Sequence, residues 1–272
     1  MIFVPASVTC IFSPEISDNP LSSGSIGVGF TINMGVTAKR GNGIKFNGKP
    51  IEFPTVEYVL NRVGLNGVEL RSELPLGCGF GLSGASALAT AMLSEQPNIH
   101  LADLAHEAEV LNRTGLGDVV TQVFGGLVVR KNASCPSKAI VLKFAWNLEL
   151  DFLIIGKIDT KEFLSEDVTR KRIKKAGIYW TKEFIKNPTI DNLFRCSNGF
   201  AKETGLIEFV EDVIEAVKSQ NGLASMVMLG KAVFALNGFK ALEEFGKPFK
   251  ARIDCCGVRN ESVCGSMQNR RF

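Results

Sequence analysis

Four glycines within eight positions constrain this chain more than any other feature of its sequence. They occupy positions 77, 79, 81 and 84 in the segment Pro75-Leu-Gly-Cys-Gly-Phe-Gly-Leu-Ser-Gly-Ala. Nearly every residue over positions 85–94 is small or a good helix former, so a helix is expected directly after the glycines. Missing side chains let a backbone approach a ligand closely, and free N–H groups at a helix start attract anions. We therefore expect a phosphate-binding turn; a tight turn without a ligand is the alternative, but it would not need so many glycines.

The pattern around the turn separates the known kinds of phosphate site. Gly79-x-Gly81-x-x-Gly84 formally matches the dinucleotide pattern, but that fold alternates strands and helices, whereas two helical patterns follow this turn. A P-loop requires a lysine where Ala85 stands, so a P-loop is excluded. Protein kinases are also excluded, because the chain has neither a His-Arg-Asp nor an Asp-Phe-Gly sequence.

A second group of polar residues follows within 40 positions of the turn. Glu107 lies in a predicted helix, and Asp118 comes directly after the turn Gly115-Leu-Gly117. Two carboxylates near a phosphate site suit metal binding and proton transfer. The structural alternatives are a solvated helix face for Glu107 and a turn cap for Asp118.

The remaining chain shows patterns of strands in its first half and of helices in its second. Asn47-Gly48 between apolar residues predicts a hairpin over residues 44–53. Strands are expected over residues 2–12, 26–36, 68–74, 124–130, 139–144 and 150–158. Helices are expected over residues 55–63, 85–94, 101–111, 161–176, 178–185, 190–203, 205–219 and 225–236, before a weakly patterned basic tail at 260–272.

Composition excludes several classes of protein. A net charge of +3 over 272 residues does not call for a nucleic-acid partner. The seven cysteines show no paired spacing that would hold zinc, so free thiols in a reducing cytoplasm are expected. Residues 1–12 lack the features of a secretory signal, and the apolar run 224–236 is shorter than the roughly 20 residues that cross a bilayer. We expect a cytoplasmic protein without a membrane span.

The glycine segment resembles the phosphate-binding motif of the GHMP kinases, which is usually written PxGxGLGSSAA. Phe80 replaces the usual leucine, Leu82 replaces the first serine, and Ser83 keeps the second. The resemblance is closer to the archaeal pantoate kinase branch of that family. It is carried by residues 3–12 (FVPASVTCIF), residues 18–29 (DNPLSSGSIGVG), Thr114-Gly-Leu-Gly-Asp-Val and residues 224–235 (ASMVMLGKAVFA).

The resemblance implies an α+β fold of two domains. Residues 1–150 would form an N-terminal ATP-binding domain similar to ribosomal protein S5, and residues 151–272 a C-terminal ferredoxin-like α/β domain. It also implies a homodimer and an ATP-dependent phosphorylation of pantoate to 4-phosphopantoate in coenzyme A biosynthesis.

The resemblance assigns roles to particular residues. Asp118 would be the catalytic base, and Ser83 with Glu107, at the family's spacing of eleven residues before Asp118, would hold Mg²⁺. Residues around the turn would bind ATP: Pro75, Gly77, Cys78, Gly79, Phe80, Gly81, Leu82, Ser83, Gly84 and Ala85. Pantoate would meet the loop that carries Ser22, Ser23, Gly24, Ser25 and Gly27.

One departure from the family concerns charge. Mevalonate kinases carry a catalytic lysine, and the pantoate kinase branch usually a histidine, where this chain has Ser7. The positive charge is expected from Mg²⁺ with Lys39, Arg40 or Arg113. Two alternatives stay open: a related kinase for a different alcohol, such as mevalonate or shikimate, and a nucleotide-binding module without catalysis.

Overall fold

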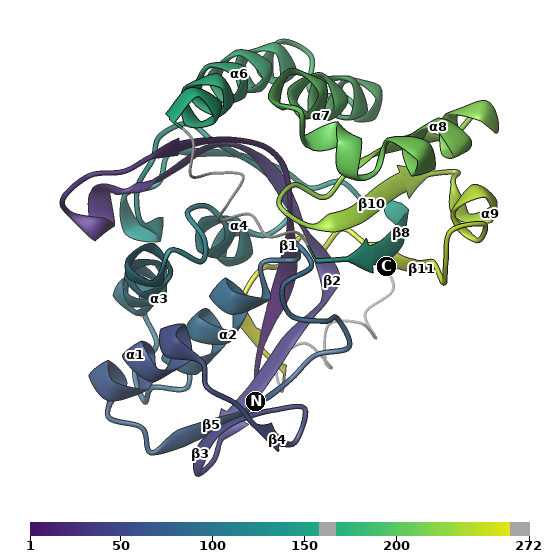
Figure 1. Ribbon diagram of the computed structural model, residues 1–272. Helices are drawn as coiled ribbons and strands as arrows, with labels where there is room; N and C mark the ends of the chain where they lie inside the picture. Colours follow the sequence, from purple (N-terminus) through teal and green to yellow (C-terminus); the bar gives the residue numbers. More distant parts are fainter. Residues whose placement is uncertain (158–166, 262–272) are drawn as a thin grey trace, which may run out of the picture.

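The computed structural model describes residues 1–157 and 167–261, which form two sheets with helices packed against them (Figure 1). Within these residues, eight strands form the first sheet. Its main path runs β12 (Arg259–Asn260), β1 (Ile2–Glu15), β2 (Gly24–Arg40), β5 (Gly67–Arg71), β3 (Gly43–Phe46) and β4 (Lys49–Pro50). Two further strands, β6 (Leu127–Arg130) and β7 (Val141–Phe144), continue from β2. The second sheet has the order β11 (Phe249–Arg252), β8 (Glu149–Gly156), β10 (Lys231–Leu236) and β9 (Leu223–Met226).

The helices form two groups, of which one lies along the long β1–β2 pair and the other covers both another part of that pair and the second sheet (Figure 1). The first group packs around α2 and comprises α1 (Pro54–Val63), α2 (Leu82–Ala91), α3 (Ile99–Asn112) and α4 (Asp118–Phe124). The second comprises α6 (Asp167–Lys186), α7 (Ile190–Thr204), α8 (Glu211–Ser219) and α9 (Phe239–Leu242). Short 3₁₀ turns lie at η1 (Pro20–Ser22), η2 (Pro136–Lys138) and η3 (Leu206–Phe209). No helix in the described ranges is long and apolar enough to cross a membrane.

The long antiparallel pair β1–β2 is the central element of the fold, against which helices of both groups pack. Its register shifts between Pro5 and Ala6, and again between Thr9 and Ile11. Proline has no N–H to donate to a ladder, so a bulge is where a buried strand tolerates it. The pair touches α2 and α4 along one part and α6 and α7 along another, and it therefore connects both halves of the chain.

Most of the expected elements are confirmed, including the α+β class. The hairpin forms at Asn47-Gly48, whose φ angles of 51° and 80° suit the turn that matches strand twist. The six cysteines in the described part of the chain are free thiols. The expected domain boundary near residue 150 coincides with the start of β8, but β12 pairs with β1 and so returns to the first sheet.

Several expected elements need correction, among them the helix expected over residues 205–219, which is the turn η3 followed by α8. Residues 225–236 are not a helix but β9, a turn and β10, because this run is buried on both faces and shows no helix-specific period. Phe124 ends the unexpected helix α4 rather than starting a strand, so Asp118 is the first residue of a helix. The two helices expected at 161–176 and 178–185 are one helix, α6, from Asp167 onward; residues 161–166 and most of the tail 260–272 lie outside the described residues.

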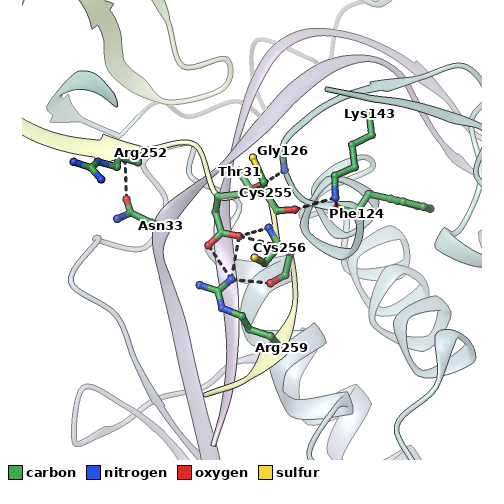
Figure 2. Close-up of polar contacts among 11 residues, drawn as sticks. Thr31, Asn33, Phe124, Gly126, Lys143, Arg252, Cys255, Cys256 and Arg259 are labelled. Atoms are coloured by element: carbon green, nitrogen blue, oxygen red, sulfur yellow. Dashed lines mark hydrogen bonds and ion pairs between the residues drawn. The ribbon is translucent and has the colours of Figure 1, made fainter. Parts of the chain in front are cut away.

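A C-terminal segment, residues 253–260, fastens the end of α4 to the first sheet (Figure 2). The main chain of Asp254 donates to the Thr31 carbonyl at 2.8 Å and accepts from the Gly126 N–H at 2.6 Å. Its carboxylate accepts from the N–H groups of Cys256 and Gly257, both at 3.0 Å, and pairs with Arg259 at 2.8 Å. The N–H of Val258 donates to the carbonyl of Gln122 in α4 at 2.9 Å. Residues far apart in sequence thus fix the helix that begins with Asp118.

Candidate active site

The glycine turn lies between β5 and α2, and its backbone is held from three directions. Gly81 has a φ of 60° and is the residue before α2, a left-handed conformation that favours glycine. Its carbonyl accepts from the Gln122 side chain at 2.8 Å, and the Phe80 carbonyl accepts from the Ser7 N–H at 3.1 Å. A Cβ on Gly79 would lie 2.8 Å from the Cα of Gly230, so the turn between β9 and β10 presses against it.

The side chains of the turn mostly serve the core rather than a ligand. Phe80 is buried, with its ring centroid 6.1 Å from that of Phe152 and 6.3 Å from that of Phe249 in the second sheet. Cys78, Leu82 and Ala85 are buried as well. Any contact that these residues make with a nucleotide is therefore through backbone groups. Phe80 takes the family's leucine position as an apolar anchor.

Ser83 is the turn residue whose side chain faces polar partners. Its hydroxyl donates to Glu109 Oε1 at 2.5 Å, and Thr114 donates to the same oxygen at 2.8 Å. Glu109 is 1% exposed, and its second oxygen, Oε2, has no hydrogen-bond partner. Burial raises the pKa of Glu109 from 4.5 to about 7, against the lowering effect of the Ser83 and Thr114 hydroxyls. A buried oxygen without a partner, beside a hydroxyl, suits a hard cation such as Mg²⁺.

Glu107, the expected metal ligand, does not lie beside Ser83. It faces α1, where its carboxylate is 4.0 Å from Arg62 and close enough to Tyr58 for a hydrogen bond. Glu107 and Glu109 are two positions apart on α3, which separates them by roughly 200° around a helix of 3.6 residues per turn. The spacing to Asp118 pointed to Glu107, whereas the phase of α3 places Glu109 beside Ser83.

Asp118 is brought against the turn from the other side. Ser7 on β1 donates to its Oδ1 at 2.7 Å, and Thr9 also lies within hydrogen-bonding reach. A Cβ built on Gly81 would lie 2.9 Å from the Asp118 Cγ, so the carboxylate sits directly over the turn. Burial raises the pKa of Asp118, while the Ser7 bond and the Arg130 charge oppose that rise. The structure thus joins Ser83, Glu109 and Asp118 around Gly81.

Comparison with known proteins identifies the family. The model of the GHMP kinase N-terminal domain matches residues 52–126, which include the turn, Glu109 and Asp118. A pantoate kinase of Methanocaldococcus jannaschii is 36% identical over 267 residues, covering 93% of this chain and 98% of the relative. A pantoate kinase of Thermococcus kodakarensis is 33% identical over 86% of each chain. This chain belongs to the pantoate kinase family.

Solved structures agree with this assignment. A structure described as a phosphotransferase related to the coenzyme A biosynthesis pathway has a TM-score of 0.79 and 27% identity, covering 95% of this chain and 98% of its own. A homoserine kinase from Listeria monocytogenes, at a TM-score of 0.64 and 14% identity over 95% and 97% of the two chains, shows the shared fold alone.

A buried cation that the sequence did not indicate, Arg130, lies near Asp118 in this member of the pantoate kinase family. Its guanidinium is buried, donates to the Ser25 carbonyl at 3.0 Å and the Thr121 hydroxyl at 2.7 Å, and acts electrostatically on Asp118. Of the cations expected instead, Lys39 pairs with Glu69 at 2.8 Å, Arg40 donates to the Leu93 carbonyl, and Arg113 is exposed at the end of α3. A lone arginine at the end of an apolar strand gave no motif by which to find it.

Some residues of the expected substrate loop are held in hydrogen bonds within the fold, and others are exposed. Ser23 is buried, and its hydroxyl bonds with the main chain of Ser17, while its carbonyl accepts from His106 Nε2 at 2.9 Å. Gly24 and Gly27 lie in the β1–β2 ladder, and Ser22 is exposed. Ser25 lies beside Arg130 through its carbonyl. His106 and Arg130 therefore fix this loop next to Asp118.

Glu109 predicts a pH dependence of stability in the metal-free protein. In the folded protein the pKa of Glu109 is raised to about 7. The protonated carboxyl therefore contributes its full stabilisation below pH 4.5, the ordinary pKa, and this stabilisation is lost as the pH rises through 7. Between pH 5 and pH 8, we expect the wild type to lose about 2 to 3 kcal/mol of unfolding free energy relative to Glu109→Gln. Urea titrations in EDTA measure this difference. A wild-type-minus-variant difference that does not change with pH would contradict the buried, partnerless carboxylate, and added Mg²⁺ should restore stability to the wild type only.

Proposed function

We propose that this chain transfers the γ-phosphate of ATP to the primary hydroxyl of pantoate, giving 4-phosphopantoate and ADP on the route to coenzyme A. The observation that carries the proposal is the meeting of Ser83, Glu109 and Asp118 around Gly81. An anion site, a set of metal-binding oxygens and a base in one place are the parts that phosphoryl transfer requires. The names of the relatives at 32–36% identity support pantoate as the acceptor.

The turn residues expected to bind ATP fit that role through their backbone. The first N–H groups of α2 are free of intrahelical partners, and the positive end of the helix dipole faces the same place. Ser83 Oγ and Glu109 Oε2 are the oxygens that would hold Mg²⁺, with Glu109 in place of Glu107. The ion would supply positive charge to the transferring phosphate.

Asp118 is the proposed base. Its carboxylate takes the proton of the pantoate hydroxyl as that oxygen bonds to the γ-phosphorus and ADP leaves with the electrons of the broken P–O bond. Ser7 holds one carboxylate oxygen at 2.7 Å and so orients the other toward the acceptor. Burial raises the pKa of Asp118, and the Arg130 charge opposes that rise and so favours the ionised carboxylate that a base requires.

Pantoate also carries a carboxylate, which needs a partner of its own. Arg130 makes no ion pair within 4 Å in the described part of the chain, and its two bonds go to neutral oxygens. We therefore place the substrate carboxylate near Arg130 and Ser25, at the loop that carries Ser22 to Gly27. Ser22 and Ser23 are then loop-forming rather than contacting residues.

Acceptor choice is tested by a coupled ADP-release assay. With ATP and Mg²⁺ present, pantoate should give the highest kcat/KM among pantoate, mevalonate, shikimate and homoserine, because a buried cation beside the base selects an acceptor with a carboxylate at the matching distance. Equal turnover of mevalonate or shikimate would favour a kinase for another alcohol. ATP binding with no ADP release from any acceptor would favour the binding module.

The role of Asp118 is tested by Asp118→Asn, which keeps the volume and removes the basic oxygen. We expect kcat with pantoate to fall by roughly 10²-fold or more, since positioned bases contribute that much, while ADP affinity stays within twofold. Glu107→Gln is the matched control and should remain near wild type, because Glu107 faces Arg62. If Asp118→Asn lowers Tm but not kcat, Asp118 is a helix-start residue and not a base.

Oligomeric state and location follow from the family resemblance alone. We propose that the enzyme acts as a homodimer in the cytoplasm. A monomer mass by light scattering at micromolar concentration would contradict the dimer.

A further inference from the structure

The second sheet places a lysine over the glycine turn. Gly156, the last residue of β8, pairs with Lys231 at the start of β10, so Lys157 follows beside Gly230. Gly230 in turn presses against the Cys78 carbonyl and the Gly79 Cα. Because Gly230 has no side chain, the turn between β9 and β10 lies directly against Cys78 and Gly79, and Lys157 beside it reaches the glycine turn.

Distances place the lysine on the first part of the turn. A Cβ built on Gly77 would lie 3.4 Å from both Cδ and Cε of Lys157 and 3.7 Å from its Nζ. The ammonium also acts electrostatically on the Cys78 thiol, opposing the rise that burial gives to the pKa of that group. Lys157 therefore covers Gly77 and Cys78, whereas Glu109 and Asp118 converge on Gly81 and Ser83.

Lys157 is exposed and makes no ion pair or side-chain hydrogen bond in the described part of the chain. Some lysines have acidic partners, as Lys39 has Glu69 at 2.8 Å and Lys250 has Asp151 at 3.8 Å, and Lys157 differs from the remaining exposed lysines in lying over the glycine turn. An ammonium without an acid, beside backbone that is shaped for an anion, has an anionic ligand as its natural partner.

We propose that Lys157 binds the non-transferred phosphates of the nucleotide, a contact that rests on the proposed function. Asp118 marks the place of the γ-phosphate at Gly81, so the Gly77 end of the turn faces the α- and β-phosphates. A charge there stabilises bound ATP, the transition state and ADP alike. It therefore contributes to nucleotide affinity and not to the chemical step.

The test measures Kd for ATP, ADP and AMP by displacement of a fluorescent ADP analogue. Lys157→Ala should weaken ATP and ADP by about 5- to 10-fold and AMP, which carries only one of the two non-transferred phosphates, by a smaller factor, with kcat at saturating ATP within twofold of wild type. Lys157→Arg should retain most of the affinity, because the charge remains. Lys49→Ala, at an exposed lysine on β4 at the far edge of the first sheet, should match wild type.

Three results would overturn the inference in distinguishable ways. If the wild type bound neither ATP nor ADP, both the proposed function and the proposed role of Lys157 would be wrong. If the wild type bound both nucleotides and Lys157→Ala bound them with the same Kd, only the proposed role of Lys157 would be wrong. If Lys157→Ala left Kd unchanged but lowered kcat more than tenfold, Lys157 would act in the chemical step and not on the non-transferred phosphates.

Discussion

The placement of two carboxylates in one small volume, Glu109 buried and Asp118 half-buried, is the constraint on which the candidate site depends. Moving an ionised carboxylate out of water costs several kcal/mol unless donors replace the lost water. Glu109 receives the hydroxyls of Ser83 and Thr114, and Asp118 receives Ser7 with the Arg130 charge nearby. These donors come from β1, α2, β6 and the turn after α3, and this explains why elements so far apart in sequence must converge here.

The position of the site was predictable, because glycine conformation is a local property. Gly77, Gly79 and Gly81 all have positive φ, as a turn shaped for an anion requires. The spacing in the sequence did not predict which glutamate lies beside Ser83, since Glu107 and Glu109 differ only in the face of α3 that they occupy. Glu109 has the alanines Ala105 and Ala108 near it on the buried face, and that helix phase was readable from the sequence.

The errors in the fold have a common physical origin. Residues 225–236 are apolar on every face because β9 and β10 lie between helices and the first sheet, and such a run carries neither a period of two nor one of 3.6. Helix α4 was missed because it spans only Asp118–Phe124, too short for a pattern to emerge. Arg130 was missed for a different reason: its role comes from tertiary neighbours, and its sequence neighbours are ordinary strand residues.

The C-terminal segment gives the fold a particular order of assembly. The main chain of Asp254 bonds to Thr31 and Gly126, and Val258 bonds to Gln122, whose side chain holds the carbonyl of Gly81. The first sheet and the glycine turn thus depend on contacts with residues more than 120 positions further along the chain. A ribosome that has made only the first half of this protein carries a chain in which α4 lacks its C-terminal anchor. Catalytic competence therefore arises late, when both halves have folded together, rather than domain by domain.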